Sequence, residues 1–226
     1  MFDAIAPRYD LLNRLLSAGL DRRWRRQAID ALGCSGTETL LDLCTGTADL
    51  AIAAVNRRRG ASRALGVDFA GAMLVRGHRK IREGHLNSRV RLVQADVTQL
   101  PITSGAVDAS TVAFGIRNTE DPRAACREIH RALRPGGRLA ILEFGLPTAP
   151  FIRPLYLWYF HHILPIIGRV VSKHTSAYAY LPASVSTFFS PESFAGLLRE
   201  VGFSEVRSVP LTFGIVYLYV AAKRSS

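Results

Sequence analysis

Short apolar runs rich in β-branched residues alternate with helical patterns between residues 39 and 144. The runs predicted as strands are Thr39–Leu43, Ala64–Asp68, Val90–Gln94, Val107–Ala113 and Arg138–Phe144. Apolar residues recur at helical spacing between them, at Leu50, Ala51, Ala54 and Val55 up to Gly60, and at Ala125, Ile129, Ala132 and Leu133 up to Pro135-Gly136. Strands separated by helices predict right-handed crossovers and a parallel sheet covered on both faces.

The two ends of the chain have patterns of their own. Residues 11–32 are predicted to be helical. Near the carboxyl end, Ser190 is a predicted N-cap with Pro191 at the first helical position, and Gly202 ends that helix. The following runs, Val206–Leu211 and Ile215–Ala222, predict an antiparallel pair at the sheet edge. The pattern therefore predicts an α/β, doubly wound, mostly parallel seven-stranded sheet.

Residues 146–189 interrupt this alternation with five prolines and many aromatic residues. An insertion of this size after the fifth strand is typical of a lid or of part of a site. We therefore expect one domain over residues 1–226, with a helical cover over residues 1–32 and an inserted cap over residues 146–189.

Composition restricts the class of protein without choosing the function. The 226 residues are 48% hydrophobic and 21% charged, which is typical of a globular protein. Cys34, Cys44 and Cys126 are odd in number and far apart, so a disulfide framework or a cysteine zinc site is not expected. No secretory signal precedes the first helix, and we expect a cytoplasmic protein. The net charge of +11 is compatible with nucleic acid, an anionic membrane or no charged partner.

The segment from Leu40 to Leu50 is the most informative in the chain. An apolar strand runs into a turn of small residues and then into a helix, which is the geometry of a nucleotide-like ligand site at strand ends. A dinucleotide site favours G-x-G-x-x-G, but this turn has a single glycine, Gly46, and an acidic residue, Asp49. A carboxylate there repels a pyrophosphate. A cationic ligand without phosphate, such as S-adenosylmethionine, fits better.

Two further acidic residues follow the next strands. Asp68 ends the second strand, where a carboxylate can accept hydrogen bonds from both ribose hydroxyls. Asp96 follows the third strand, at a place suited to the adenine amino group. Either residue alone is more often a helix N-cap. Acidic residues at three successive strand ends favour a ligand site.

These features resemble the class I S-adenosylmethionine-dependent methyltransferases, and other segments narrow the resemblance. Tyr9-Asp-Leu-Leu-Asn13, Phe114-Gly-Ile-Arg-Asn118, the Arg131–Phe144 segment, Tyr178-Ala-Tyr-Leu181 and Leu211-Thr-Phe-Gly-Ile215 are similar to the ubiquinone/menaquinone biosynthesis C-methyltransferases. The resemblance implies a Rossmann-like fold and S-adenosylmethionine as the cofactor. By position, it implies that the cofactor-binding residues are Asp42, Gly46, Thr47, Asp68, Asp96, Val97 and Ala113. The family's loop commonly has glycine where this chain has Ala48.

The implied reaction is methylation of a ring carbon beside a phenolic hydroxyl. Such a hydroxyl has a pKa of about 10, so the site must help to form the phenolate. Arg117 follows the fourth strand and keeps its charge, so we expect it to stabilise the phenolate, with Asn118 orienting it or the substrate. The proton acceptor stays open among Tyr178, His174, Tyr180, Tyr9 and a water molecule. No metal is expected.

The resemblance implies a prenylated quinol as substrate, either a naphthoquinol or a benzoquinol, and another phenolic small molecule is the alternative. The apolar segment 151–171 contains prolines and arginines, so it is expected to cover the core or to hold a prenyl tail rather than to span a membrane. The Arg22-Arg-Trp-Arg-Arg26 cluster is either a solvated helix face or a contact with anionic lipid. The fourth-strand motif disfavours a nucleic-acid partner. The oligomeric state stays open, a homodimer included.

Overall fold

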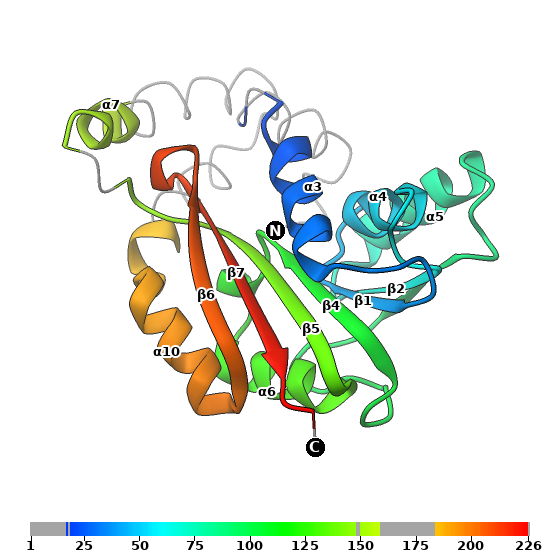
Figure 1. Ribbon diagram of the computed structural model, residues 1–226. Helices are drawn as coiled ribbons and strands as arrows, with labels where there is room; N and C mark the ends of the chain where they lie inside the picture. The colour runs from blue at the N-terminus through cyan, green and yellow to red at the C-terminus, as the bar shows by residue number, and fades with distance from the viewer. Residues whose placement is uncertain (1–16, 18, 148–149, 159–183, 226) are drawn as a thin grey trace.

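The computed structural model describes residues 17, 19–147, 150–158 and 184–225. Its strands form one seven-stranded sheet in the order β3-β2-β1-β4-β5-β7-β6 (Figure 1). The strands are β1 (Thr39–Leu43), β2 (Arg63–Asp68), β3 (Val90–Gln94), β4 (Val107–Ala113), β5 (Leu133–Phe144), β6 (Phe203–Leu211) and β7 (Val216–Lys223). Strands β1 to β5 pair in parallel, and β7 runs antiparallel to both of its neighbours. The predicted mostly parallel sheet is thus confirmed.

Helices cover both faces of this sheet. The helices α3 (Asp21–Leu32), α4 (Asp49–Asn56) and α5 (Gly71–Glu83) lie over one face, where Trp24, Ile29 and Ile81 enter the core. The helices α6 (Pro122–Ala132) and α10 (Pro191–Val201) lie over the other face, where Ile129 and Phe194 are fully buried. Because both faces are covered, β1 is buried almost throughout, as the continuous apolar run predicts.

The register of the parallel strands brings their carboxyl ends to one edge of the sheet. Leu43 pairs with Val67 of β2 and with Val112 of β4, and Asp68 pairs with Gln94 of β3. The loops after β1, β2, β3 and β4 therefore meet at this edge. Ligands of open α/β sheets bind at such an edge, where the strand order reverses between β1 and β4.

Several boundaries follow local chemistry that the sequence makes visible. Strands β1, β3 and β4 have the predicted bounds. Ser190 caps α10 by accepting a hydrogen bond from the Ser193 amide, and Pro191 occupies the first helical position. Gly202 ends this helix in the left-handed conformation, at φ +113°. The capping prediction for α10 is confirmed.

Other boundaries differ from the prediction. A turn with Gly19 at φ +77° precedes Asp21, so α3 begins there and the predicted helix over residues 11–32 is wrong as one continuous element. Helix α4 ends at Asn56, before Gly60, because Arg57 adopts an extended conformation. Leu133 belongs to β5, where it pairs with Val107, and a register shift separates this pair from the rest. The pattern could not locate that irregularity.

The segment after β5 is described in part. A short helix, α7 (Ile152–Trp158), lies near the turn between β6 and β7, since Tyr156 packs with Ile215. A single helical turn at residues 184–187 returns the chain to α10. Residues 1–16 of the predicted cover and residues 159–183 of the predicted cap lie outside the described residues. Among the helices that are described, none is long and apolar enough to span a membrane.

Candidate active site

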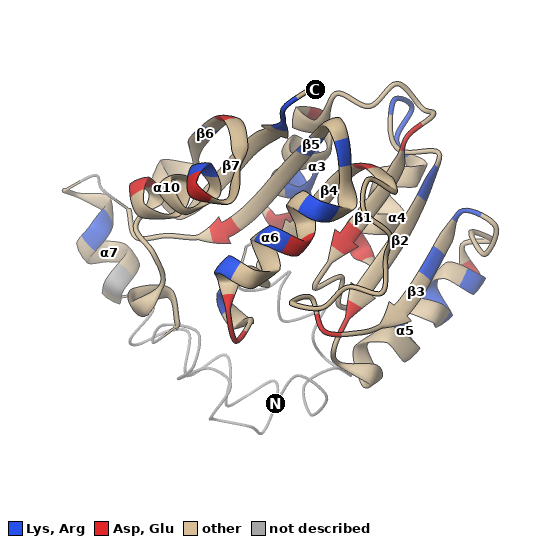
Figure 2. Ribbon diagram, turned by 90° about the horizontal axis from the view of Figure 1, so that it is seen from below, with Lys and Arg blue, Asp and Glu red and all other residues tan. Residues whose placement is uncertain are grey.

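A cavity of about 290 Å³ lies at the carboxyl edge of the sheet. The loops after β1, β2, β3 and β4 contribute its walls, as the topology predicts. Its lining residues are Cys44, Gly46, Asp68, Phe69, Ala70, Met73, Asp96, Val97, Ala113, Phe114, Gly115, Asn118, Thr119 and Glu120. Five of the predicted cofactor-binding residues are among them. Figure 2 shows acidic segments at the ends of the central strands.

The loop after β1 folds over the strand ends through three left-handed residues. Cys44, Gly46 and Ala48 have φ values of 51°, 56° and 66°. This conformation costs a non-glycine residue on the order of 1 kcal/mol, so the surrounding structure must hold it. The Thr45 amide donates to the Val67 carbonyl at 3.1 Å, which fastens the loop to β2. Ala48 thus stands where a glycine would carry no such cost.

Asp68 holds the loop after β1 at a second point. Its carboxylate accepts hydrogen bonds from the Gly46 amide at 2.7 Å and from the Ala70 amide at 2.8 Å. A carboxylate has about four acceptor positions, so these bonds leave capacity for ligand hydroxyls. Asp68 lines the cavity, and the exposed ring of Phe69 follows it on the same wall. The placement agrees with the predicted role at a ribose.

Asp96 holds a turn rather than the start of a helix, so the alternative interpretation as a helix N-cap is wrong, and it lines the cavity. Its Oδ1 accepts from the Thr98 amide and hydroxyl, both at 2.8 Å. These bonds, the Thr98 amide first, lower the pKa of the carboxyl group. Val97 follows it and is buried at the cavity wall. Asp96 therefore forms a turn at the cavity wall, and its binding role stays a prediction.

Asp42 lies deeper, at the end of β1, and is fully buried. Its two oxygens accept from the Thr45 hydroxyl at 2.6 Å and from the Thr111 hydroxyl at 2.7 Å. Burial raises the pKa of this carboxyl to about 6, against the opposing effects of these hydroxyls and of Arg25. Asp42 lines a second cavity, of about 20 Å³, together with Gly46, Thr47 and Ala113. Gly46 and Ala113 lie on both cavities, so Asp42 is next to the larger one.

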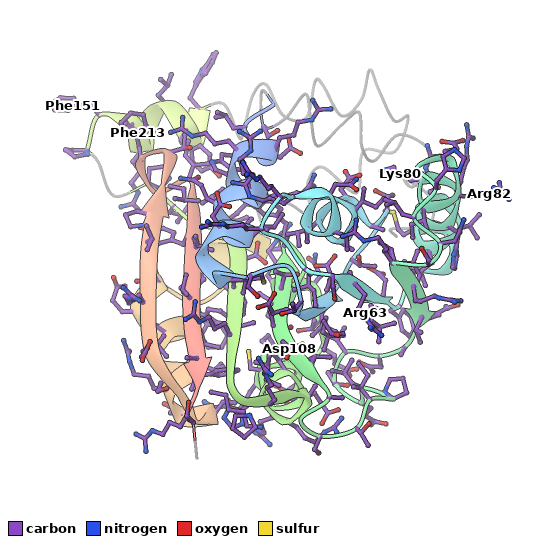
Figure 3. The ribbon with its side chains drawn as sticks, turned by 45° about the vertical axis from the view of Figure 1, so that its right-hand side comes forward. Arg63, Lys80, Arg82, Asp108, Phe151 and Phe213 are labelled. Carbon is purple, nitrogen blue, oxygen red and sulfur yellow. The ribbon has the colours of Figure 1, made fainter. Side chains whose placement is uncertain are left out.

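The sequence-based argument that the negative charge of Asp49 repels a pyrophosphate is wrong in its detail. Asp49 accepts from Lys80 at 2.6 Å, and Lys80 extends from α5 toward α4 (Figure 3). Arg25 lies 3.3 Å from its other oxygen. Two cations therefore compensate this carboxylate. Lys80 also donates to the Thr47 hydroxyl at 2.8 Å, and Thr47 lines the smaller cavity rather than the larger one.

The charges on the walls of the larger cavity give a better argument against a pyrophosphate ligand. Within the part of the chain that the structure describes, they carry three carboxylates, Asp68, Asp96 and Glu120, and no lysine, arginine or histidine. An anionic pyrophosphate would lie among negative charges without a partner, which is unfavourable. The residues present therefore fit S-adenosylmethionine, whose sulfonium and ammonium groups are positive.

The turn after β4 forms the other end of the cavity. Phe114 adopts φ +60°, and Phe114, Gly115, Asn118 and Thr119 line the wall. The Asn118 side chain donates to the Phe114 carbonyl at 3.4 Å. A Cβ atom on Gly115 would collide with Cys44, so only glycine lets this turn approach the loop after β1. The turn after β4 therefore packs against the loop after β1, and both segments line the same cavity.

Arg117, another predicted catalytic residue, does not line the described wall of the cavity. The Arg117 side chain is 7% exposed and forms an ion pair with Glu143, which is fully buried. Direct contact between Arg117 and a phenolate stays a prediction. Tyr178 and the alternative proton acceptors His174, Tyr180 and Tyr9 lie outside the described residues. Among the described residues, no three potential ligands form a metal group.

Several cavity residues escaped the sequence argument. Phe69 is 76% exposed although it is a large aromatic residue, and Met73 and Phe114 form apolar wall beside it. Phe69 directly follows Asp68, so the sequence could have indicated that Phe69 lies at the cavity. Cys44 also lines the wall, but burial and the neighbouring carboxylates raise the pKa of its thiol, which excludes it as a nucleophile at neutral pH.

The fold is that of the class I S-adenosylmethionine-dependent methyltransferases. A putative methyltransferase of this kind from Methanococcus maripaludis has a TM-score of 0.70 at 21% identity, covering 100% of this chain and 95% of that chain. A putative methyltransferase from Haloferax volcanii, solved with the Trm112 activator, has a TM-score of 0.69 at 18% identity, covering 99% of this chain and 98% of that chain.

The chain belongs to the ubiE/COQ5 methyltransferase family, which it matches over residues 1–223. The UbiE ubiquinone/menaquinone biosynthesis C-methyltransferase of Geobacter sp. strain M21 is 44% identical over 223 residues, 99% of this chain and 94% of that one. A demethylmenaquinone methyltransferase of Thermus thermophilus is 46% identical over 220 residues, 97% of this chain and 98% of that one. The predicted family and the S-adenosylmethionine cofactor are thus confirmed.

The raised pKa of Asp42 predicts that its charged form lowers the stability of the fold. Between about pH 4 and pH 6 the folded chain holds a proton on Asp42 that the unfolded chain releases, so this group destabilises the fold as the pH rises through that window. Asp42→Asn should therefore raise the free energy of unfolding at pH 7.5 by up to about 3 kcal/mol, and the gain should shrink toward pH 4.

The same substitution should weaken binding of S-adenosylhomocysteine at least about tenfold, because it removes a negative charge next to the cavity. Urea denaturation at several pH values and calorimetry measure the two effects. Asp108→Asn is the matched control, since Asp108 lies at the opposite end of β4 and binds the Thr39 amide. A variant with unchanged affinity, or one that is less stable at pH 7.5, would contradict this account of Asp42.

Proposed function

We propose that the protein transfers the methyl group of S-adenosylmethionine to a ring carbon of a prenylated quinol, converting demethylmenaquinol to menaquinol. The names of its relatives support this substrate class, since relatives in Thermus thermophilus and Bacteroides fragilis are demethylmenaquinone methyltransferases at 46% and 39% identity. The observation that carries the proposal is one cavity whose wall holds Asp68 and Asp96 after β2 and β3, and Phe114 and Asn118 after β4. Such a wall would bring a cationic donor and a flat aromatic acceptor together at this edge of the sheet.

The donor end binds through charge and hydrogen bonds. When bound there, S-adenosylmethionine supplies an electrophilic methyl group on a positively charged sulfur. Asp68 accepts hydrogen bonds from ligand hydroxyls, and its bond to the Gly46 amide keeps the loop after β1 in place. Val97 and Met73 provide apolar wall for the base.

The acceptor end must favour the phenolate form of the quinol. The side chain of Asn118 reaches the cavity wall and can donate a hydrogen bond to the hydroxyl oxygen. The positive charge of Arg117 lies behind the same turn, where the guanidinium donates to the Phe114 carbonyl at 2.8 Å. We assign the proton to one of the predicted acceptors, Tyr178, His174, Tyr180, Tyr9 or a water molecule.

A panel of acceptors with labelled methyl donor tests the proposed function. Short-tailed demethylmenaquinol should gain label at the ring, and a benzoquinol precursor with the same tail measures ring selectivity. Catechol represents the alternative, another phenolic small molecule. Label in catechol alone would establish the alternative and overturn the quinol substrate. Loss of label when the quinol is replaced by the oxidised quinone is expected, because the quinone lacks the hydroxyl that activates the ring.

Arg117→Ala should abolish turnover while affinity for S-adenosylhomocysteine stays within a few-fold of the unmodified protein. Removing one preorganised charged donor costs on the order of 3 kcal/mol of activation free energy, or more than about 100-fold in kcat. Arg123→Ala is the control, since Arg123 pairs with Glu200 on the outer surface of α6 and α10. Unchanged turnover, or an equal loss of turnover and cofactor affinity, would refute the role of Arg117.

We also propose that the protein docks on anionic membranes, where prenylated quinols reside. Exposed aromatic residues lie near each other beyond the carboxyl edge of the sheet, with Phe151 before α7 and Phe213 in the β6–β7 turn (Figure 3). Arg153 is exposed on α7, and Arg22 and Arg26 are exposed on α3. Aromatic side chains favour the bilayer interface, and each basic residue near anionic lipid contributes about 1 kcal/mol.

Co-sedimentation with vesicles tests this docking. Vesicles with anionic lipid should bind the protein more tightly than zwitterionic vesicles, and salt should reduce the difference. The double variant Phe151→Ser with Phe213→Ser should lower the partition coefficient about tenfold or more, because two exposed aromatic rings no longer enter the interface. Val75→Ser, at an exposed apolar position on α5, should leave it unchanged. Equal binding to both kinds of vesicle would rule out the electrostatic contact.

A further inference from the structure

Glu143 is a buried charge that neither the cofactor site nor the sequence argument uses. It lies at the end of β5 and is fully buried. Its Oε1 lies 2.5 Å from Nη1 of Arg117 and accepts from the Phe144 amide at 2.9 Å. Its Oε2 accepts from the Arg117 amide at 3.3 Å. Burying a carboxylate costs several kcal/mol unless its partner is fixed in good geometry, so Glu143 and Arg117 constrain each other.

Arg117 joins three segments that are distant in the sequence. Nη1 donates to the Phe114 carbonyl at 2.8 Å, Nε donates to the Ser184 hydroxyl at 3.3 Å, and the guanidinium pairs with Glu143 of β5. The guanidinium carbon also lies 5.3 Å from the centre of the Phe144 ring. The turn after β4, the end of β5 and the helical turn after the insertion therefore meet at one side chain.

This junction supports the acceptor end of the cavity directly. Phe114 and Asn118 line the cavity. The Phe114 carbonyl accepts hydrogen bonds from both the Arg117 guanidinium and the Asn118 side chain. Phe114 adopts a left-handed conformation that the surrounding structure must hold. With the Arg117 guanidinium fixed by Glu143, the carbonyl of Phe114 and the amide of Asn118 are fixed as well.

We propose that Glu143 is a positioning residue for methyl transfer: through Arg117 it holds the Phe114–Asn118 turn and the returning segment at Ser184 in the geometry that the acceptor requires. Glu143 does not touch either substrate. The inference rests on the proposed function for its effect on turnover, but the ordering of the turn is independent of what the acceptor is.

Glu143→Gln tests the proposal, because it keeps the shape of the side chain, removes the charge and turns an amide donor toward the donors of Arg117. We expect kcat to fall about 100-fold, as for a small misplacement of catalytic groups, with affinity for S-adenosylhomocysteine within threefold of the unmodified protein. Glu143→Asp retains the charge but is one methylene shorter, so it should fold and show the same selective loss. Glu128→Gln is the control, since Glu128 pairs with Arg131 on α6, away from the cavity.

A double-mutant cycle distinguishes positioning through Arg117 from general support of the fold. If Glu143 acts through Arg117, Glu143→Gln should lower kcat no further than threefold when it is added to Arg117→Lys. Losses that multiply in the double variant would overturn the proposal. So would a kcat of Glu143→Gln equal to that of the unmodified protein, or a parallel loss of S-adenosylhomocysteine affinity.

Hydrogen exchange gives a readout that needs no acceptor. Glu143→Gln should accelerate amide exchange in peptides that cover residues 114–119 and 184–188, and Glu128→Gln should not. Unchanged exchange there would overturn the inference whatever the activity. Accelerated exchange in a protein that methylates none of the quinols would uphold the positioning role and refute the proposed function instead.

Discussion

The site depends on holding carboxylates at the carboxyl edge of the sheet, where the described wall of the larger cavity has no lysine, arginine or histidine. Asp68 is bound by the amides of Gly46 and Ala70, and Asp42 by the hydroxyls of Thr45 and Thr111. Backbone amides and hydroxyls satisfy these oxygens without neutralising their charge. The negative potential therefore stays available to a cationic ligand, and the raised pKa of Asp42 reflects the cost of keeping it.

The two ends of the cavity are built by different means. The donor end comes from β1, β2 and β3, where hydrogen bonds along consecutive strand ends set the geometry. The acceptor end comes from the turn after β4, where a buried ion pair between Arg117 and Glu143 connects β4, β5 and the segment at Ser184. Gly115, packed against Cys44, brings the two ends together.

The sequence was sufficient for the sheet because short runs rich in apolar and β-branched residues mark the parallel strands, and β1, β3 and β4 have the predicted bounds. It also indicated that Asp68, Asp96 and Val97 lie at the cavity wall, since Asp68 ends β2 and the other two lie within three residues of the end of β3. It could not locate the register shift at Leu133 or the end of α4 at Asn56, which depend on pairing with distant strands and on one extended residue.

Ion pairs between distant side chains were the other feature that the sequence could not predict. Asp49 is compensated by Lys80, which is 31 residues away, and Arg117 is bound by Glu143, which is 26 residues away. Neither pair has a local signal, because both arise from the packing of separate crossovers. The predicted roles of Thr47 and Arg117 were therefore assigned by position alone, and the structure adds the partners that hold them.

Calorimetry of the unmodified protein with two ligands tests the central claim most directly. The carboxylate wall predicts that S-adenosylhomocysteine binds with one site per chain and that NAD, whose pyrophosphate is anionic, gives no binding heat at the same concentrations. Saturable binding of NAD together with no binding of S-adenosylhomocysteine would contradict the account.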